Sequence, residues 1–317
     1  MTTRREFLEG AAAALLLVRS PSPGGRGGQG VRRLGFSTLG CPQWTWPQIL
    51  DFAATHGYAA VELRGIQTNM DLTKVPELSP ERLGDAKRQL AARGLSVSCL
   101  GASAQMHDMD PAKHAAQLDE GRRFIDLAQA LGAPYVRVFG NNYVEGVPRA
   151  DMLEHIAGGL RTLGEYARGK NVTVVIESHG DFTDSPTLLE ILQKADSPNV
   201  ALLWDAHHTF VAGKEEPEET VRQLGRYIRH THLKDSVPAG NDRRYVLTGT
   251  GQVPVKRQIE ALVKMGYRGY FSFEWEKRWH PEIEEPEVAF AQFADVARGY
   301  LRGAGASGAG APPNRRR

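Results

Sequence analysis

The chain has 317 residues, of which 41% are hydrophobic and 24% charged, so it is long enough to bury a full core. Its 39 basic and 37 acidic residues give a formal net charge of +2, which offers no electrostatic reason to expect a nucleic-acid partner. The only two cysteines, Cys41 and Cys99, exclude a disulfide framework and a cysteine-based zinc site. Two free, half-buried thiols are the simpler expectation, and a single bridge between them is the alternative.

The start of the chain has the features of an export signal. A twin arginine, Arg4-Arg5, is followed by an apolar run from Ala11 to Val18 that is too short to span a bilayer as a helix. The segment Thr3–Leu8 resembles the twin-arginine export signal, which implies that the twin-arginine machinery exports the folded protein. We therefore expect an exported, periplasmic or extracellular protein, with residues 1–30 forming the signal peptide and linker. An amphipathic N-terminal helix is the alternative, and no later apolar stretch is long enough for a membrane span.

From Val31 to Arg302, short apolar runs alternate with amphipathic segments, as in repeated β-α units. The apolar runs predict strands at Leu34–Thr38, Ala59–Leu63, Leu95–Leu100, Tyr135–Phe139, Val172–Glu177, Val200–Asp205, Ile228–Leu233 and Tyr270–Glu274. The amphipathic segments predict helices at Trp46–Thr55, Pro80–Ala92, Glu120–Leu131, Ala150–Arg168, Thr187–Lys194, Glu218–Tyr227, Val255–Met265 and Pro286–Leu301. Serine-proline pairs at Ser79 and Ser185 are typical of helix starts. Glycines mark the expected helix ends at Gly57, Gly94, Gly132 and Gly266.

Eight β-α units of this length predict a single (β/α)₈ TIM barrel over residues 31–302, of the α/β class. Consecutive apolar positions, as in Val172–Ile176, fit parallel strands that are buried on both faces. A doubly wound open sheet is the rival, but it would normally carry a glycine-rich phosphate loop that Leu39–Pro42 does not provide. Residues 303–317 are low in complexity, and we expect a disordered tail.

The last four predicted strands end in acidic residues and a histidine: Glu177, Asp205, His232 and Glu274. In barrels the active site lies at the carboxyl ends of the strands, so these side chains should share one rim. Charges at the end of an apolar strand are costly unless they are paired, and crowded carboxylates raise one another's pKa. One divalent cation would resolve both problems, whereas separate salt bridges at the rim are the alternative.

Three longer motifs carry a family resemblance: His230–Asp235, Gly249–Pro254 and Gly266–Glu274. With the pattern of strand ends, they resemble the sugar phosphate isomerase/epimerase superfamily, the xylose isomerase-like TIM barrels. The resemblance covers nearly the whole chain after the signal. It implies one divalent metal ion held by the four side chains named above.

The match to one branch of that superfamily is poorer. In the ketose 3-epimerases, a histidine three residues after the metal-binding aspartate contacts the substrate, and His208 stands at that position. The arginine six residues after the metal-binding histidine is replaced by Pro238, and a glutamate six residues after the first ligand is replaced by Thr183. The resemblance therefore supports the metal chemistry more than any particular substrate.

Three carboxylates and one imidazole favour Mn²⁺, Mg²⁺ or Co²⁺, with Zn²⁺ as the alternative. Such an ion stabilises an enediolate formed from a sugar-like substrate. Glu177 and Glu274 come from strands that are not neighbours, so we expect them to act also as the catalytic groups that abstract and return the proton.

Further residues near the strand ends are candidates for substrate binding, and each has a structural alternative: His208, Lys234, Glu62, His179 and Trp44. Lys234 could instead pair with Asp235, and Glu62 with Arg64, while Trp44 would stack on a sugar ring or pack within its loop. His230 lies on the face of His232 but deeper in the strand, which predicts a packed interior histidine. A barrel-interior Arg137 needs an anionic partner, for which the metal-site carboxylates are candidates.

The leading hypothesis is a metal-dependent isomerase or epimerase that acts on a sugar or a sugar-like ketose. A metal-dependent lyase or dehydratase on a keto-sugar, keto-glycoside or inosose is the alternative. An endonuclease of the same superfamily would need more histidine ligands and a basic face, which the sequence does not show. A non-catalytic sugar-binding barrel is the remaining class. The sequence leaves the substrate and any homo-oligomer open.

Overall fold

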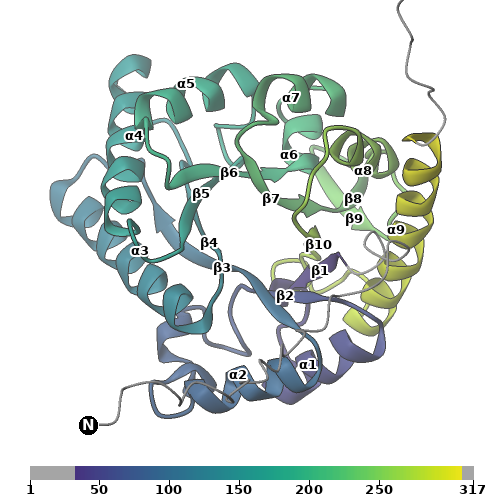
Figure 1. The fold of residues 1–317 in the computed structure, drawn as a ribbon. Coiled ribbons are helices and arrows are strands. Elements are labelled where there is room, and N and C mark those ends of the chain that lie inside the picture. The colour runs from purple at the N-terminus through teal and green to yellow at the C-terminus, as the bar shows by residue number, and fades with distance from the viewer. Residues whose placement is uncertain (1–32, 309–317) are drawn as a thin grey trace, which may run out of the picture.

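The computed structural model describes residues 33–308. Its parallel strands form a closed barrel in the order β1-β10-β7-β6-β5-β4-β3-β2, and the helices surround this barrel (Figure 1). The barrel strands are β1 Leu34–Ser37, β2 Ala60–Leu63, β3 Ser96–Gln105, β4 Tyr135–Phe139, β5 Thr173–Glu177, β6 Val200–Asp205, β7 Ile228–Leu233 and β10 Phe271–Phe273. The α-helices are α1 Trp46–Thr55, α2 Leu83–Ala92, α3 Pro111–Leu131, α4 Arg149–Tyr166, α5 Ser185–Ala195, α6 Ala206–Val211, α7 Pro217–Leu224, α8 Val255–Lys264 and α9 Pro286–Gly308. The predicted (β/α)₈ TIM barrel is confirmed.

Helix boundaries differ from the predictions where capping decides them. Helix α3 begins at Pro111, earlier than predicted. The Asp110 carboxylate caps it there, because it accepts hydrogen bonds from backbone N–H groups of the first turn, which have no partner within the helix. Asp184, and not Ser185, caps α5 in the same way. Helix α2 begins at Leu83 after a turn, so the predicted start at Pro80 is wrong. The glycines predicted to end helices all have the left-handed backbone conformation, with φ between 66° and 81°.

At the two ends of the chain the predictions fall partly outside the described residues. The predicted signal and linker, residues 1–30, lie outside them. Helix α9 continues to Gly308, so the predicted start of the tail at residue 303 lies inside a helix. In the described part of the chain, no helix is both long and apolar enough to cross a membrane.

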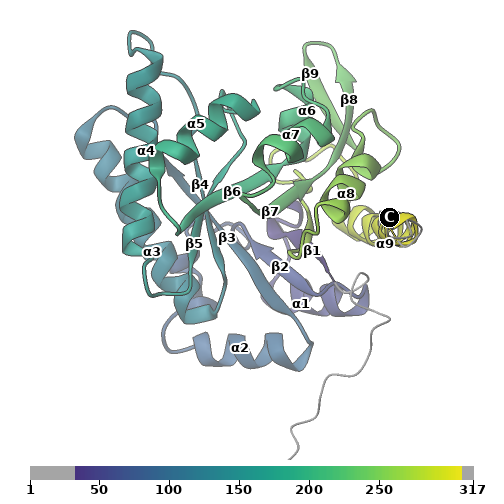
Figure 2. The same cartoon turned by 45° about the horizontal axis from the view of Figure 1, so that its top comes forward.

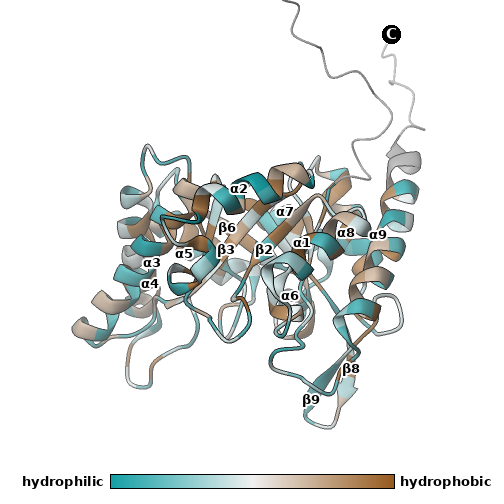
Figure 3. Ribbon diagram, turned by 90° about the horizontal axis from the view of Figure 1, so that it is seen from below, coloured by the Kyte–Doolittle hydropathy of each residue, from teal (hydrophilic) through white to brown (hydrophobic). Residues whose placement is uncertain are grey.

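A β-hairpin that the sequence did not predict follows the carboxyl end of β7. Its strands β8, Asp235–Ala239, and β9, Asp242–Val246, pair antiparallel and project from one end of the barrel (Figures 2 and 3). The buried Asp235 carboxylate accepts hydrogen bonds from the backbone N–H groups of Gly249, Gly251 and Val253. A Cβ on Gly251 would lie 2.1 Å from the Asp235 carboxylate, so this close approach requires glycine. Asp235 therefore anchors the return of the chain to the barrel.

The core has two parts, and the second positions the site. Most buried apolar residues lie between the strands and the helices. A small separate cluster fills part of the barrel interior: Cys99, Val175, Ala201 and Leu203. The charged interior residues Glu62, Arg137, Glu177, Asp205 and His232 are buried as well. Both cysteines are free and buried, which fits the expectation of two thiols.

Candidate metal centre

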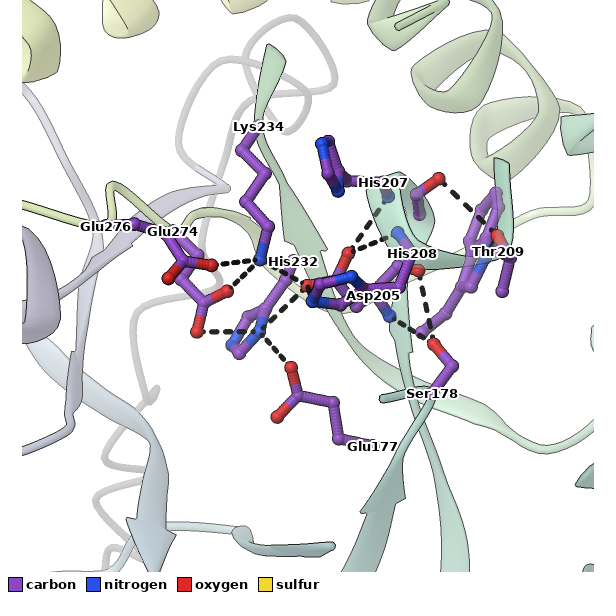
Figure 4. A network of polar contacts seen from close by, with 12 residues as sticks. Glu177, Ser178, Asp205, His207, His208, Thr209, His232, Lys234, Glu274 and Glu276 are labelled. Carbon is purple, nitrogen blue, oxygen red and sulfur yellow. Dashed lines mark hydrogen bonds and ion pairs between the residues drawn. The ribbon is translucent and has the colours of Figure 1, made fainter. Parts of the chain in front are cut away.

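Four side chains from neighbouring strand ends meet at one point of the barrel: Glu177 from β5, Asp205 from β6, His232 from β7 and Glu274 directly after β10. Each of them is 4% exposed or less. His232 Nδ1 lies 3.2 Å from Glu177 Oε1, 3.2 Å from Glu274 Oε1 and 3.8 Å from Asp205 Oδ2 (Figure 4). Metal–ligand bonds of about 2.1 Å separate neighbouring ligand atoms by roughly 3.0–3.4 Å. The distances from His232 to Glu177 and Glu274 lie within this range and the distance to Asp205 is slightly longer, so the four groups predicted as ligands lie close enough together to be candidates for one ion.

The barrel register and a helix cap orient these groups. Asp205 and His232 are direct partners across the parallel strands β6 and β7. One oxygen of Asp205, Oδ1, accepts hydrogen bonds from the backbone N–H groups of His207 and His208 at 2.9 and 3.0 Å and so caps helix α6. Its other oxygen, Oδ2, is thereby left facing the site.

Lys234 is completely buried next to these ligands. Its Nζ lies 2.6 Å from Asp205 Oδ2 and 2.9 Å from Glu276 Oε1, and it also donates to Glu274 Oε2. The sequence predicted that Lys234 contacts a substrate oxygen or pairs with Asp235. In the structure its ammonium instead forms ion pairs with acidic groups of the site itself. Glu276 was missed, although its position two residues after Glu274 was a usable signal.

Arg137 lies on the other side of the cluster. Its Nε is 3.2 Å from Glu177 Oε2, which confirms the expected pairing with a metal-site carboxylate. Arg64 lies near it, and a Cβ on Gly101 would clash with both arginine side chains. Burial first and then the charge of Arg137 lower the pKa of the Arg64 guanidinium to about 9, against the opposing effect of Glu177.

Glu62 is fully buried and faces two histidines. Its carboxylate lies 2.6 Å from His230 Nε2 and 2.9 Å from His232 Nε2. This overturns the expected pair with Arg64. Both carboxylate oxygens face imidazole nitrogens, so the expected contact of Glu62 with a substrate hydroxyl stays a prediction. His230 is the interior histidine that was predicted.

Two more histidines lie half-buried beside the cluster. The rings of His179 and His208 are 5.1 Å apart, and His208 Nε2 is 3.6 Å from Asp205 Oδ2. Burial, with a contribution from the Lys234 charge, lowers the pKa of both imidazoles, so they are neutral near pH 7. His207 points elsewhere, to Ser236 Oγ at 2.7 Å. Of these two neighbouring histidines, His208 is therefore the one that lies beside Asp205 Oδ2.

Trp44 is placed differently from the expectation that it stacks on a sugar ring. It is 8% exposed, and its ring packs against Phe52 of α1 and Phe290 of α9. Its indole N–H donates to Glu287. The ring is thus mostly enclosed by its neighbours, as the loop-packing alternative predicts.

The electrostatics of the cluster fit a divalent cation. Burial, together with Glu274 and Glu177, raises the pKa of Asp205 to about 7 despite the ammonium of Lys234. Burial by itself lowers the pKa of the His232 imidazole. The carboxylates of Glu274, Glu62 and Glu177 together outweigh burial, so the pKa of His232 lies well above its usual value. With an ion bound, His232 would be neutral and Asp205 ionised, so that five carboxylates against three fixed cations would leave two negative charges for one divalent ion to balance. These groups are Glu62, Glu177, Asp205, Glu274 and Glu276 against Arg64, Arg137 and Lys234.

Fold and site together define a class of enzyme-like barrels with a carboxylate-rich centre at the strand ends. The chain belongs to the xylose isomerase-like TIM barrel family, whose pattern matches residues 50–296. It is 27% identical to an inosose dehydratase of Geobacillus thermodenitrificans, over 68% of this chain and 79% of that protein. It is 24% identical to an inosose isomerase of Halalkalibacterium halodurans, over 71% of this chain and 80% of that protein.

A solved structure shows the same fold with a metal. The crystal structure of the IOLI protein with a bound zinc atom superposes with a TM-score of 0.66, at 20% identity, and covers 87% of this chain and 97% of that one. The relatives named by sequence are thus enzymes that act on inososes, and this structural neighbour has bound a divalent ion.

Proposed function

We propose that the protein is a divalent-metal-dependent isomerase or epimerase that moves a proton on a carbon next to the carbonyl group of a sugar or sugar-like ketose. The observation that carries the proposal is the convergence of Glu177, Asp205, His232 and Glu274 on one point. These four residues are the proposed ligands. The ligand set favours Mn²⁺, Mg²⁺ or Co²⁺, and the zinc in the IOLI protein keeps Zn²⁺ as an alternative.

A bound divalent cation would polarise the substrate carbonyl and stabilise the negative charge that develops when the neighbouring carbon loses its proton. The two glutamates approach from β5 and β10, which are separated in the barrel by β6 and β7. We assign proton abstraction and return to Glu177 and Glu274, one on each face of the substrate. Arg137 forms an ion pair with the second oxygen of Glu177, and Lys234 donates to the second oxygen of Glu274, so both carboxylates are oriented by a neighbouring cation.

A specific observation also favours a second function, a dehydratase. The neutral imidazoles of His179 and His208 lie side by side near Asp205. One of them can accept the proton from the carbon and pass it to the departing hydroxyl group on the same face, so that water leaves and a carbon–carbon double bond forms. The similarity to an inosose dehydratase supports this candidate as well.

One experiment separates the two functions. The purified protein, loaded with Mn²⁺ or Co²⁺, is incubated in D₂O with inososes, free ketoses and 3-keto-glycosides, and products are followed by NMR. An isomerase gives deuterium at the carbon next to the carbonyl without loss of water, whereas a dehydratase gives an unsaturated ketone. Glu177→Gln and Glu274→Gln should abolish turnover and weaken metal binding. Full activity of both variants after chelation and dialysis would refute the proposal.

We further propose that the protein is exported by the twin-arginine machinery and meets a small carbohydrate outside the cytoplasm. Residues 3–8 support this, although they lie outside the described residues. Replacing Arg4 and Arg5 together by lysine should keep the protein in the cytoplasmic fraction. An unchanged distribution of that variant between cell fractions would count against the proposal.

A further inference from the structure

We propose that Glu62 is a positioning residue that holds the metal-binding imidazole of His232, and that His230 holds Glu62 in turn. The inference rests on the proposed metal site and deepens it. Glu62 belongs to β2 and His232 to β7, which are separated in the barrel by β1 and β10. The contact therefore spans the barrel interior beneath the site.

The two nitrogens of His232 face different partners. Nδ1 lies 3.2 Å from an oxygen of Glu177 and 3.2 Å from an oxygen of Glu274, among the groups that would share the ion. Nε2 lies 3.0 and 2.9 Å from the two oxygens of Glu62. A metal-ligating histidine usually donates its other ring N–H to a carboxylate, which fixes the tautomer and the ring orientation. Glu62 thus keeps a proton on Nε2 and leaves Nδ1 for the metal.

His230 completes the arrangement from below. Its Nε2 lies 2.6 Å from Glu62 Oε2, so the carboxylate accepts from two imidazoles at once. Glu62, His230 and His232 are all 0% exposed, so bulk water cannot replace either hydrogen bond. A glutamine at residue 62 has only one acceptor oxygen, and its NH₂ group would face one of the two imidazole N–H groups. Glu62 Oε2 contacts both imidazoles, and Oε1 lies 3.0 Å from His232 Nε2, so only a carboxylate accepts from both histidines without placing a second donor against His232.

A second metal ion between these three residues is the competing explanation, since their ligand atoms also lie within 4.8 Å of one another. The nitrogen–oxygen distances of 2.6 to 3.0 Å are those of direct hydrogen bonds. The 2.6 Å between His230 Nε2 and Glu62 Oε2 is shorter than the roughly 3.0 Å that separates two ligands of one ion. The geometry therefore favours a support for one metal over a second metal site.

The test compares Glu62→Gln with Glu215→Gln. Glu215 accepts hydrogen bonds from Ser185 N at 2.7 Å and Thr220 Oγ1 at 2.8 Å in the outer layer, so it controls for the loss of a structural carboxylate. Titration of each full-length variant with Mn²⁺ and with Zn²⁺ against a chelating indicator gives the affinity. We expect Glu62→Gln to weaken binding by about 10–100-fold and Glu215→Gln to leave it unchanged. Saturating Mn²⁺ should restore most of the activity of Glu62→Gln.

Structural readouts separate this inference from the proposed function. In the Zn²⁺-loaded wild type, ¹H–¹⁵N NMR of labelled histidine should show His232 protonated at Nε2, with a downfield proton that moves upfield in Glu62→Gln. If the wild type binds the ion and Glu62→Gln binds it equally well, this inference fails while the metal site stands. If the wild type binds no divalent ion, both the proposed metal site and this inference fail. If the wild type binds two ions per chain, Glu62, His230 and His232 are ligands of a second ion, and this inference fails. Should Glu62→Gln not fold, His230→Phe replaces it, with a smaller loss expected and unchanged affinity refuting the inference.

Discussion

Replacing Lys234 by methionine should destabilise the metal-free protein far more than the metal-loaded protein. The Lys234 ammonium is 0% exposed and contacts carboxylates of Asp205, Glu274 and Glu276. Methionine has a similar length but no charge, so the carboxylates lose their nearest cation. Removing one partner from a buried ion pair costs about 3–5 kcal/mol of the free energy of unfolding. At about 2 °C per kcal/mol for a domain of this size, the melting temperature should fall by about 6–10 °C.

A bound divalent ion changes this result, because it supplies positive charge to Asp205 and Glu274 directly. The loss in Lys234→Met should then shrink to roughly 1.5–3 kcal/mol, the value of hydrogen bonds to charged groups. Differential scanning fluorimetry with EDTA and with saturating Mn²⁺ measures both states of wild type and variant. The stabilisation by Mn²⁺ should therefore be larger in the variant than in the wild type.

Lys170→Met provides the matched control, since Lys170 Nζ contacts Asp126 at 2.8 Å on the protein surface. An exposed ion pair contributes about 0–1 kcal/mol, and nothing connects this one to the metal. The control should melt close to the wild type in both conditions. Equal destabilisation of Lys234→Met with and without Mn²⁺ would refute the reasoning that Lys234 and the ion neutralise the same carboxylates.

Three further predictions concern the fold. Gly101→Ala should lower the free energy of unfolding by about 1–3 kcal/mol, because a Cβ there would lie 2.6 Å from Arg64. Gly158→Ala in α4 should raise it by about 0.5–1 kcal/mol, because a Cβ there would meet no neighbouring atom within 4 Å. Urea melts of the two variants and the wild type measure both changes. Cys41 and Cys99 should not react with a disulfide reagent until the protein unfolds, because burial raises the pKa of both thiols; a reaction count of two before unfolding would contradict this. Asp110→Ala should destabilise the first turn of α3 by removing its cap, and hydrogen exchange should be faster in that turn than in the wild type.

The sequence determined the fold because its signals are local and periodic. Apolar runs such as Val172–Ile176 fit strands that are covered on both faces, and the glycines at 57, 94, 132 and 266 favour helix ends through their local conformation. The same regularity predicted that strand ends would gather Glu177, Asp205, His232 and Glu274, because all parallel strands of a barrel end at one rim. Local capping decided two helix starts differently: Asp110 caps α3 well before its predicted start, and Asp184 caps α5 in place of Ser185.

What only the tertiary structure decided is which charged groups of the rim and interior meet each other. Glu62 and His232 are 170 residues apart in sequence, and their contact depends on side chains that cross the barrel. The sequence near Glu62 suggested Arg64 as its partner, because the two residues are close neighbours in the chain. Likewise, the acidic partners of Lys234 follow from closure of the barrel, which brings β7 beside β10. The sequence by itself therefore specified the barrel and the proposed metal ligands, whereas barrel closure determined the residues that orient those ligands.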